Sequence, residues 1–168
     1  MRVWQGRRIG VDLLEVDRPD RPGRSHPFEI VRFGQGVAIL PVTDDGRVVI
    51  IRQLRPAVGV PILEIPAGKL EEGEEILEAA RRELYEETGI EGAELRLMHS
   101  IYTTPGFCDE VIHLVIARGG TVGPPHLEED EWIDPPLFLT REDIRSRIAS
   151  GEIRDAKTIV ALGLGGFL

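Results

Sequence analysis

The order of apolar and polar positions along the chain predicts short strands interrupted by one well-formed helix. The apolar runs typical of strands span residues 28–33, 36–42, 47–54, 62–65, 93–103, 110–117 and 132–139. Residues 3–16 alternate loosely and predict one or two further strands, followed by a loop at 17–27 that contains prolines and a glycine. The pair Asp45-Gly46 between two β-rich runs predicts a hairpin.

The segment 73–89 has the composition and the ends of a helix. Glu74 and Glu75 suit the positive end of a helix dipole, and Gly89 stands where a left-handed residue would end the helix. Three apolar residues recur at helical spacing, and we expect this stripe to pack on a sheet. They are Leu77, Ala80 and Leu84.

The same helix carries three closely spaced carboxylates, Glu83, Glu86 and Glu87. Their spacing of three and four residues places them on one face, where they repel one another. A hard divalent cation such as Mg²⁺ or Mn²⁺ would relieve this repulsion through oxygen ligands. The alternative is an ordinary solvated acidic helix, which most glutamate-rich helices are.

Two further helices are predicted after the last strand, at 141–149 and from Asp155 or Ala156 to Leu164. Thr140 and Asp143 resemble a capping pair for the first of them. Prolines at 135 and 136 interrupt the run 132–139 and predict an edge strand. The irregular alternation of strands and helices predicts an α+β fold with a mixed β-sheet sandwiched between α-helices.

Composition narrows the class of protein. The 168 residues, 42% hydrophobic and 29% charged, suffice for one core with a small appendage. A formal charge of −9 argues against general nucleic-acid binding, which depends on neutralising phosphates. No apolar run reaches the length of about twenty residues that a membrane span needs. Cys108 is the only cysteine, which excludes an internal disulfide and indicates the cytoplasm.

The stretch from Gly68 to Ile90 matches the pattern G-x5-E-x7-R-E-apolar-x-E-E-x-G-apolar at every position. This pattern resembles the signature of the Nudix hydrolases, which cut nucleoside diphosphates linked to another moiety. The resemblance implies that residues 36–168 form a Nudix catalytic domain. Residues 1–35 then form a small N-terminal β segment, which is either an extra sheet on the main domain or an arm that joins two subunits in a homodimer.

The chain also resembles the ADP-ribose pyrophosphatase branch of that family. Pro105, sixteen residues beyond Gly89, is similar to a marker of this branch. Four segments look like the branch as well, namely 52–58, 63–68, 105–110 and 155–162. The resemblance implies Mg²⁺-dependent hydrolysis of ADP-ribose to AMP and ribose 5-phosphate, with Mn²⁺ as an alternative metal.

Site residues follow from the resemblance, position by position. The metal ligands are the backbone carbonyl of Ala67 and the carboxylates of Glu83 and Glu87, with Glu86 close by. Arg82 and Glu86 complete the helix part of the catalytic group, with Arg82 orienting the carboxylates. Arg55 matches an arginine that holds the diphosphate, and its alternative is a surface charge at a strand end.

Four more residues match positions around the substrate. Gly106 and Glu110 correspond to the lining of the pocket, while Phe28 and Glu29 correspond to a segment that reaches the adenosine end, often from the other subunit. Phe28 is alternatively a buried strand residue. The general base corresponds to Glu129, with Glu131 second, within the acidic segment 126–133. The alternative for this segment is an acidic surface loop.

Two other functions stay open. One is a Nudix pyrophosphatase for another nucleoside diphosphate derivative, such as a nucleotide sugar, a dinucleoside polyphosphate or FAD. The other is an ADP-ribose-sensing Nudix domain that binds without cutting, although such domains lose carboxylates that this chain retains.

Overall fold

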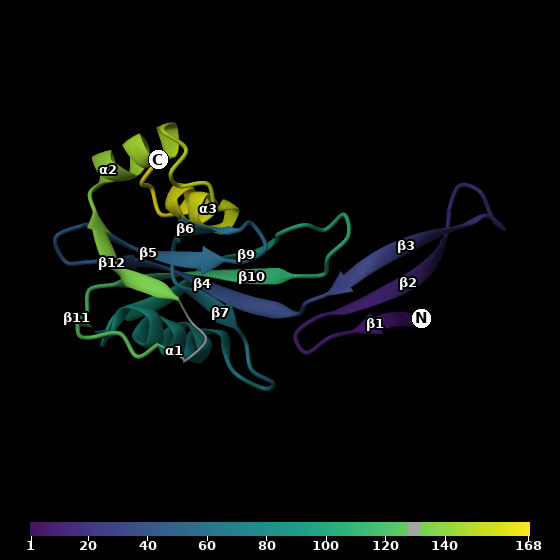
Figure 1. The fold of residues 1–168 in the computed structure, drawn as a ribbon, viewed down its shortest axis with the longest axis horizontal. Helices are drawn as coiled ribbons and strands as arrows, with labels where there is room; N and C mark the ends of the chain where they lie inside the picture. The colour runs from purple at the N-terminus through teal and green to yellow at the C-terminus, as the bar shows by residue number, and fades with distance from the viewer. Residues whose placement is uncertain (128–131) are drawn as a thin grey trace.

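The computed structural model describes residues 1–127 and 132–168 and shows one β-sheet between two helical layers (Figure 1). Helix α1 (Ile76–Thr88) covers one face of the sheet. Helices α2 (Arg141–Ala149) and α3 (Ala156–Leu164) cover the other face. The predicted α+β class, with a mixed sheet between helices, is confirmed.

The central sheet has seven strands in the order β12-β5-β4-β10-β9, with β6 paired to β5 and β7 paired to β4. Their bounds are β4 (Gln35–Val42), β5 (Val48–Arg55), β6 (Val60–Glu64), β7 (Ala67–Lys69), β9 (Glu94–Tyr102), β10 (Val111–Arg118) and β12 (Ile133–Leu139). Strands β4 and β10 run parallel, and the other pairs are antiparallel, so the sheet is mixed. A separate pair joins β8 (Ile90–Glu91) to β11 (Thr121–Val122).

The hydrophobic core lies on both faces of the central strands, because successive side chains of a strand point to opposite faces. On the α1 face, Val37 and Ile39 pack with Ala80 and Leu84. On the opposite face, alternate residues of β4 and β5 pack with residues of α2 and α3. These residues include Ala38, Leu40, Ile50, Ile144 and Leu162. The continuous apolar sequence of β4 therefore reflects a strand that is buried on both sides.

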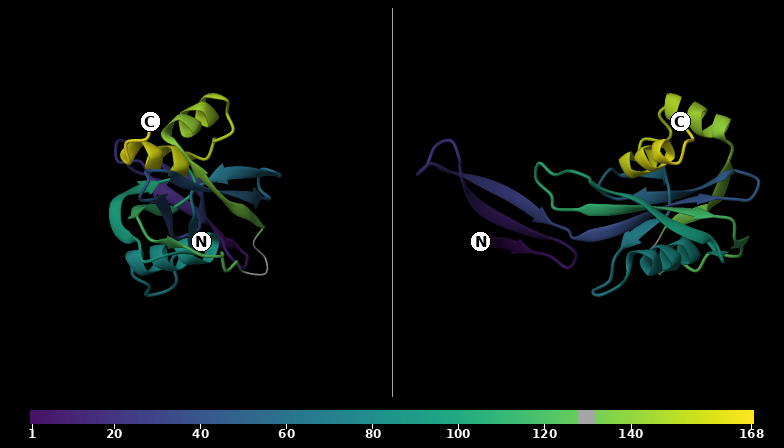
Figure 2. Two further views of the ribbon diagram at one scale, coloured as in Figure 1. Left: turned by 90° about the vertical axis from the view of Figure 1, so that its left-hand side faces the viewer. Right: turned by 180° about the vertical axis from the view of Figure 1, so that it is seen from behind.

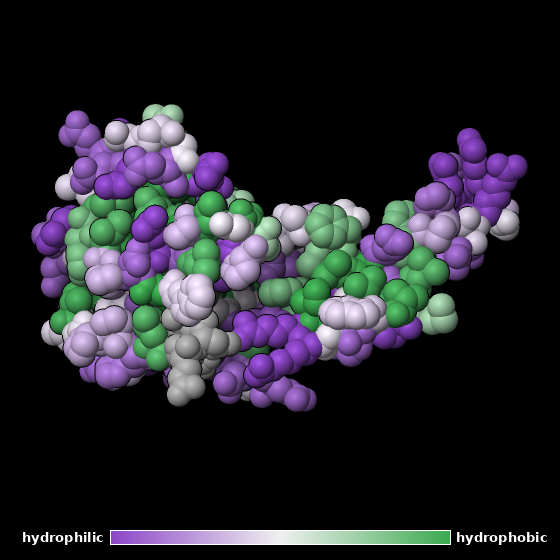
Figure 3. Space-filling view, in the orientation of Figure 1, coloured by the Kyte–Doolittle hydropathy of each residue, from purple (hydrophilic) through white to green (hydrophobic). Residues whose placement is uncertain are grey.

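The N-terminal residues form a second, three-stranded sheet of β1 (Arg2–Gln5), β2 (Gly10–Asp17) and β3 (Ser25–Arg32). This sheet projects away from the body of the protein, as Figures 1 and 2 show. Hydrophobic side chains gather on the face that Figure 3 presents, and several are substantially exposed. The exposed large apolar residues of residues 1–32 are Met1, Val3, Trp4, Val16 and Phe28.

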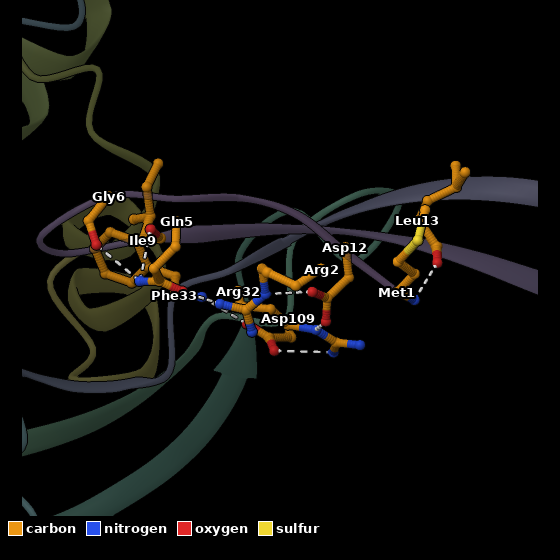
Figure 4. A network of polar contacts seen from close by, with 10 residues as sticks. All are labelled: Met1, Arg2, Gln5, Gly6, Ile9, Asp12, Leu13, Arg32, Phe33 and Asp109. Atoms are coloured by element: carbon orange, nitrogen blue, oxygen red, sulfur yellow. Dashed lines mark hydrogen bonds and ion pairs between the residues drawn. The ribbon is translucent and has the colours of Figure 1, made fainter.

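One carboxylate joins the N-terminal sheet to the body (Figure 4). Asp109, in the loop before β10, accepts hydrogen bonds from the backbone N–H of Phe33 at 2.8 Å and from Arg32 Nη1 at 3.1 Å. Arg32 Nε also donates to Asp12 on β2 at 2.8 Å. The orientation of the projecting sheet is thus fixed by contacts with the segment that precedes β10.

Several local predictions are confirmed. Gly46 has a φ of 82° in the turn between β4 and β5, and Gly89 has a φ of 69° at the end of α1. Thr140 and Asp143 form a reciprocal capping box at α2. Strand β12 lies at the edge of the sheet, and its register shifts between Asp134 and Leu137, where the two prolines stand.

Other predictions were wrong in detail. Leu77 is 37% exposed, and Ile76 and Ala79 take its place in the apolar stripe of α1. Strand β3 begins at Ser25, inside the segment that we assigned to a loop. Strands β7, β8 and β11 were not predicted, since two or three residues are too few to show a period.

Candidate metal and diphosphate site

Glu83 and Glu87 lie on the buried side of α1 rather than on its solvent face. They are only 7% and 1% exposed, although charged residues are seldom buried without a partner. They share this side with Ala79, Ala80 and Leu84, which pack against the sheet. The helix therefore carries two carboxylates toward the sheet, at the edge of its apolar stripe.

Both carboxylates lie against the backbone of the short strand β7. The N–H of Ala67 donates a hydrogen bond to Glu87 Oε2 at 2.9 Å. A β-carbon built on Gly68 would lie 1.9 Å from Glu83 Oε1, so only glycine leaves room for this side chain. Ala67, Gly68, Glu83 and Glu87 are thus brought together.

Arg82 connects the remaining acidic residues of the pattern. Its Nε and Nη2 each donate to Glu74 at 3.0 Å, and its Nη1 lies 2.7 Å from Glu83 and 3.2 Å from Glu86. The hydrogen bond to Glu74 is the main reason why the pKa of Arg82 is raised well above its usual value. The same bond holds the pKa of Glu74 below its usual range. Arg82 therefore orients the loop before α1 and the Glu83 carboxylate together.

The donor chemistry of this cluster fits a hard divalent cation. Two nearly buried carboxylates and the backbone carbonyl of Ala67 offer oxygen ligands, and glycine at 68 leaves room for the Glu83 carboxylate. Among the described residues, however, no three His, Cys, Asp or Glu side chains gather into a group that could hold an ion. Glu86 differs from Glu83 and Glu87 in exposure, because 29% of its side chain is accessible to solvent.

Arg55, the predicted diphosphate residue, ends strand β5 beside the fully buried carboxylate of Glu64. Its Nε donates to Glu64 Oε1 at 2.8 Å. Burial lowers the pKa of Arg55, but the hydrogen bond and the charge of Glu64 outweigh this effect and raise the pKa overall. The negative charge of Glu87 acts in the same direction, which is consistent with a position near the carboxylate pair.

Helix α3 holds the other oxygen of Glu64. Lys157 Nζ donates to Glu64 Oε2 and also lies 3.1 Å from Asp155 Oδ1. Asp155 caps the helix by accepting the N–H of Thr158, whose hydroxyl in turn accepts the N–H of Ile65 at 2.9 Å. The first turn of α3 therefore fixes the two residues that lead into Pro66 and the site.

Glu129 and Glu131, the predicted bases, lie outside the described residues, but both flanks of their segment are placed. Before it, the N–H of His126 donates to the carbonyl of Glu86 at 2.7 Å, and the His126 ring stacks on Tyr85 at 4.5 Å. After it, the carbonyl of Trp132 accepts the N–H of Leu54 at 3.1 Å. The chain thus enters the segment beside Glu86 and leaves it next to Arg55.

The other predicted substrate residues lie on β3 and in the segment before β10. Phe28 and Glu29 are exposed on β3, in the projecting sheet, and so do not join the carboxylate pair of their own chain (Figure 1). Phe28 is therefore not the buried strand residue that we considered. Gly106 is exposed in the turn before β10, and Glu110 accepts a hydrogen bond from Thr103 at 2.6 Å.

Sequence reasoning missed the roles of Glu64, Lys157 and Thr158. One signal was present, because Glu64 is a charged residue within the apolar run Ile62–Ile65. A buried charge needs a partner, so this position called for a cation from elsewhere in the chain. The partner could not be chosen from the sequence, since it lies 93 residues away.

Comparison with known proteins agrees with this geometry. The model of the NUDIX domain matches residues 32–159, most of the chain. The chain belongs to the Nudix family. It is therefore a Nudix hydrolase with the Nudix fold, and both predictions are confirmed.

Individual relatives span nearly the whole chain. An ADP-ribose pyrophosphatase of Bacillus subtilis is 38% identical over 163 residues, which cover 96% of this chain and 86% of the relative. A methanol dehydrogenase activator of Bacillus methanolicus is 37% identical over the same shares. A GDP-mannose pyrophosphatase of Escherichia coli strain K12 is 34% identical, with 88% of this chain and 82% of the relative covered. The predicted resemblance to the ADP-ribose pyrophosphatases is thereby supported.

Proposed function

We propose that this Nudix hydrolase cleaves the diphosphate of ADP-ribose to AMP and ribose 5-phosphate in the presence of Mg²⁺. The buried pair Glu83 and Glu87, held against the backbone of Ala67 and Gly68, is the observation that carries this function. The similarity to the Bacillus subtilis ADP-ribose pyrophosphatase supports the choice of substrate.

Ala67, through its carbonyl, and the carboxylates of Glu83 and Glu87 are the proposed metal ligands, and Glu86 stands nearby. When bound there, Mg²⁺ supplies positive charge that stabilises the diphosphate oxygens and makes water more acidic. Mn²⁺ would serve the same purpose with the same oxygen ligands. Arg82 keeps Glu83 in place through its hydrogen bond of 2.7 Å.

The proposed general base is Glu129, with Glu131 as the second candidate. The base takes a proton from water while the water oxygen attacks one phosphorus atom, and the bridging P–O bond breaks. The placed flanks support this role, since the chain runs from Glu86 to the neighbour of Arg55 across this segment. Arg55 is the proposed ligand of the substrate diphosphate, and Gly106 and Glu110 are proposed to line the pocket.

We further propose a homodimer formed through the N-terminal β segment at residues 1–35, beside a catalytic domain at 36–168. The exposed apolar residues of the projecting sheet support an interface there, because such patches are costly in water. In this arrangement Phe28 and Glu29 would reach the adenosine end of a substrate in the partner. A position in the cytoplasm is proposed from the single cysteine.

A nucleotide sugar is the second candidate substrate, because the chain is also similar to GDP-mannose pyrophosphatases. The described chain has no helix long and apolar enough to cross a membrane. Hydrolysis of ADP-ribose and hydrolysis of a nucleotide sugar would use the same carboxylates and the same bond-breaking step. The two substrates differ only in the groups around the diphosphate that the protein must recognise.

The test is hydrolysis of ADP-ribose and GDP-mannose with and without Mg²⁺, comparing wild type with Glu83→Gln and Glu87→Gln. Each variant is expected to lower turnover about a hundredfold or more, since it removes charge from the site. Glu78→Gln on the exposed side of the same helix is the matched control and should keep wild-type turnover. Unchanged rates in both site variants would contradict the function.

A further inference from the structure

Glu64 is a fully buried carboxylate that contacts two cations from different parts of the fold. Its Oε1 accepts from Arg55 on β5, and its Oε2 accepts from Lys157 on α3. An unpaired charge at this depth would be strongly disfavoured, so both partners are needed for its burial. Lys157 is itself only 11% exposed, which keeps it from reaching a ligand directly.

Of the two cations that contact Glu64, Arg55 is the one with hydrogen-bond donors left for a ligand. Arg55 uses Nε for Glu64, and within the described part of the chain its terminal Nη atoms form no hydrogen bond. Its side chain is 37% exposed, so Arg55 is not closed off from a ligand. A guanidinium held through Nε still presents a planar pair of donors, which matches phosphate oxygens.

The cluster around Glu64 is connected through the backbone to the buried pair Glu83 and Glu87. Glu64 is three residues before Ala67, whose N–H binds Glu87. The intervening Ile65 is fastened to Thr158 of α3 by a buried hydrogen bond of 2.9 Å. The same turn of α3 therefore supports both Arg55, through Lys157 and Glu64, and the backbone leading to Ala67.

We propose that Glu64 and Lys157 are positioning residues that hold the Arg55 guanidinium against the diphosphate of the substrate. Glu64 fixes Arg55 through Nε, and Lys157 neutralises the second oxygen so that the carboxylate stays buried in this orientation. This inference rests on the proposed role of Arg55 in the proposed function.

Affinity for ADP-ribose and for inorganic pyrophosphate, measured by calorimetry in EDTA, tests the proposal without a metal. Glu64→Gln leaves one acceptor oxygen for two cations, so Arg55 competes with Lys157 for it. We expect both affinities to fall about tenfold, which corresponds to the loss of one hydrogen bond to a charged group. In an Arg55→Ala background the same substitution should change neither affinity.

A rescue variant separates positioning from a general loss of structure. In Glu64→Gln/Lys157→Met the competing cation is gone, and the amide oxygen can again accept from Arg55. We therefore expect the double variant to regain affinity to within about threefold of wild type. Asp134→Asn is the matched control, because it removes the acidic partner of Arg52, an exposed arginine on the same strand, and should leave affinity unchanged.

Thermal unfolding of each variant shows whether it is folded. If Glu64→Gln does not fold, Glu64→Asp keeps the charge but shortens the side chain, and the same dependence on Arg55 is expected. Wild-type affinity in Glu64→Gln, or an equal loss in the Arg55→Ala background, overturns the proposal. If wild type binds neither ligand in EDTA, this proposal is overturned, because Arg55 then holds no diphosphate by itself. The proposed function is judged separately, by hydrolysis of ADP-ribose and GDP-mannose with Mg²⁺.

Discussion

Gly68 on β7 and Glu83 on α1 meet so closely that a β-carbon on Gly68 would lie 1.9 Å from Glu83 Oε1. The two residues are fifteen positions apart in the sequence, and they belong to different layers of the fold. The glycine of the Nudix pattern is thus explained by packing, because any side chain would displace the carboxylate that we assign to the metal.

Gly68→Ala is therefore expected to lower turnover strongly, by about a hundredfold, because Glu83 must leave its position. The substitution should also lower the free energy of unfolding, since Glu83 is nearly buried and its displacement breaks its contact with Arg82. Hydrolysis rates and thermal unfolding measure the two effects. Turnover within about twofold of wild type would show that the close approach is not required.

Gly163→Ala is a contrasting substitution in helix α3. A β-carbon at this position would meet only Leu168 Cδ1, at an ordinary contact distance of 3.6 Å. Alanine restricts the unfolded chain more than glycine does, so the free energy of unfolding should rise by about 0.5–1 kcal/mol. Urea unfolding measures the gain, and hydrolysis rates should stay at the wild-type level. A loss of stability would mean that the end of α3 needs glycine.

His113 predicts a loss of stability as the pH falls below neutrality. Burial on β10 holds its pKa below the usual value of 6.5, and its ring nitrogens contact Ser100 at 2.7 Å and Gln35 at 2.8 Å. The unfolded chain then binds the proton more readily than the folded chain. The stabilising contribution is fully present above pH 6.5 and is lost as the pH falls through 6.5 toward the lower folded pKa.

Urea unfolding at about pH 7.5 and about pH 5.5 measures this effect, and His113→Gln should make the difference between the two smaller. Asp45, whose folded pKa is lowered to about 2 chiefly by its hydrogen bond with Arg47, contributes stability that is lost only at lower pH. The titration of Asp45 therefore does not hide the effect of His113 on the free energy of unfolding between these two pH values. An identical pH dependence in wild type and variant would contradict the prediction.

Asp109→Ala is expected to loosen the projecting N-terminal sheet. The substitution removes hydrogen bonds from Phe33 and Arg32, and the backbone N–H groups beside β3 lose their acceptor. Limited proteolysis should cut faster near residues 33–34, and the free energy of unfolding should fall by about 1–3 kcal/mol. Asp20→Ala, which affects only exposed ion pairs with Arg18 and Arg21, is the matched control. Equal proteolysis of the two variants would contradict this role for Asp109.

Elements with a clear period or a specific end signal were predictable from the sequence. The capping box at Thr140 and the left-handed Gly89 depend on local backbone chemistry, which a few neighbouring residues determine. The family resemblance likewise implied that Glu83 and Glu87 meet the backbone at Ala67, and the structure places them beside it. Local and tertiary preferences agree at these positions.

Long-range contacts were the part that the sequence left open. The rotation of α1 that exposes Leu77 and buries Glu83 depends on which side chains face the sheet, and both stripes have helical spacing. The pairing of Glu64 with Lys157 depends on how α3 crosses the sheet. The N-terminal strands are joined to the body by Asp109, whose carboxylate binds backbone N–H groups more than seventy positions away. The pattern of residues along one sequence does not show which distant residues come into contact.

The crossing of α3 over residues 64–65 has a consequence for biosynthesis. A ribosome completes the carboxylate helix long before it adds Asp155, Lys157 and Thr158, so a nascent chain carries its hydrolytic signature while Glu64 has only Arg55 beside it. The candidate metal and diphosphate site can therefore mature only after helix α3 has been synthesised and has docked, which closes the buried charge cluster.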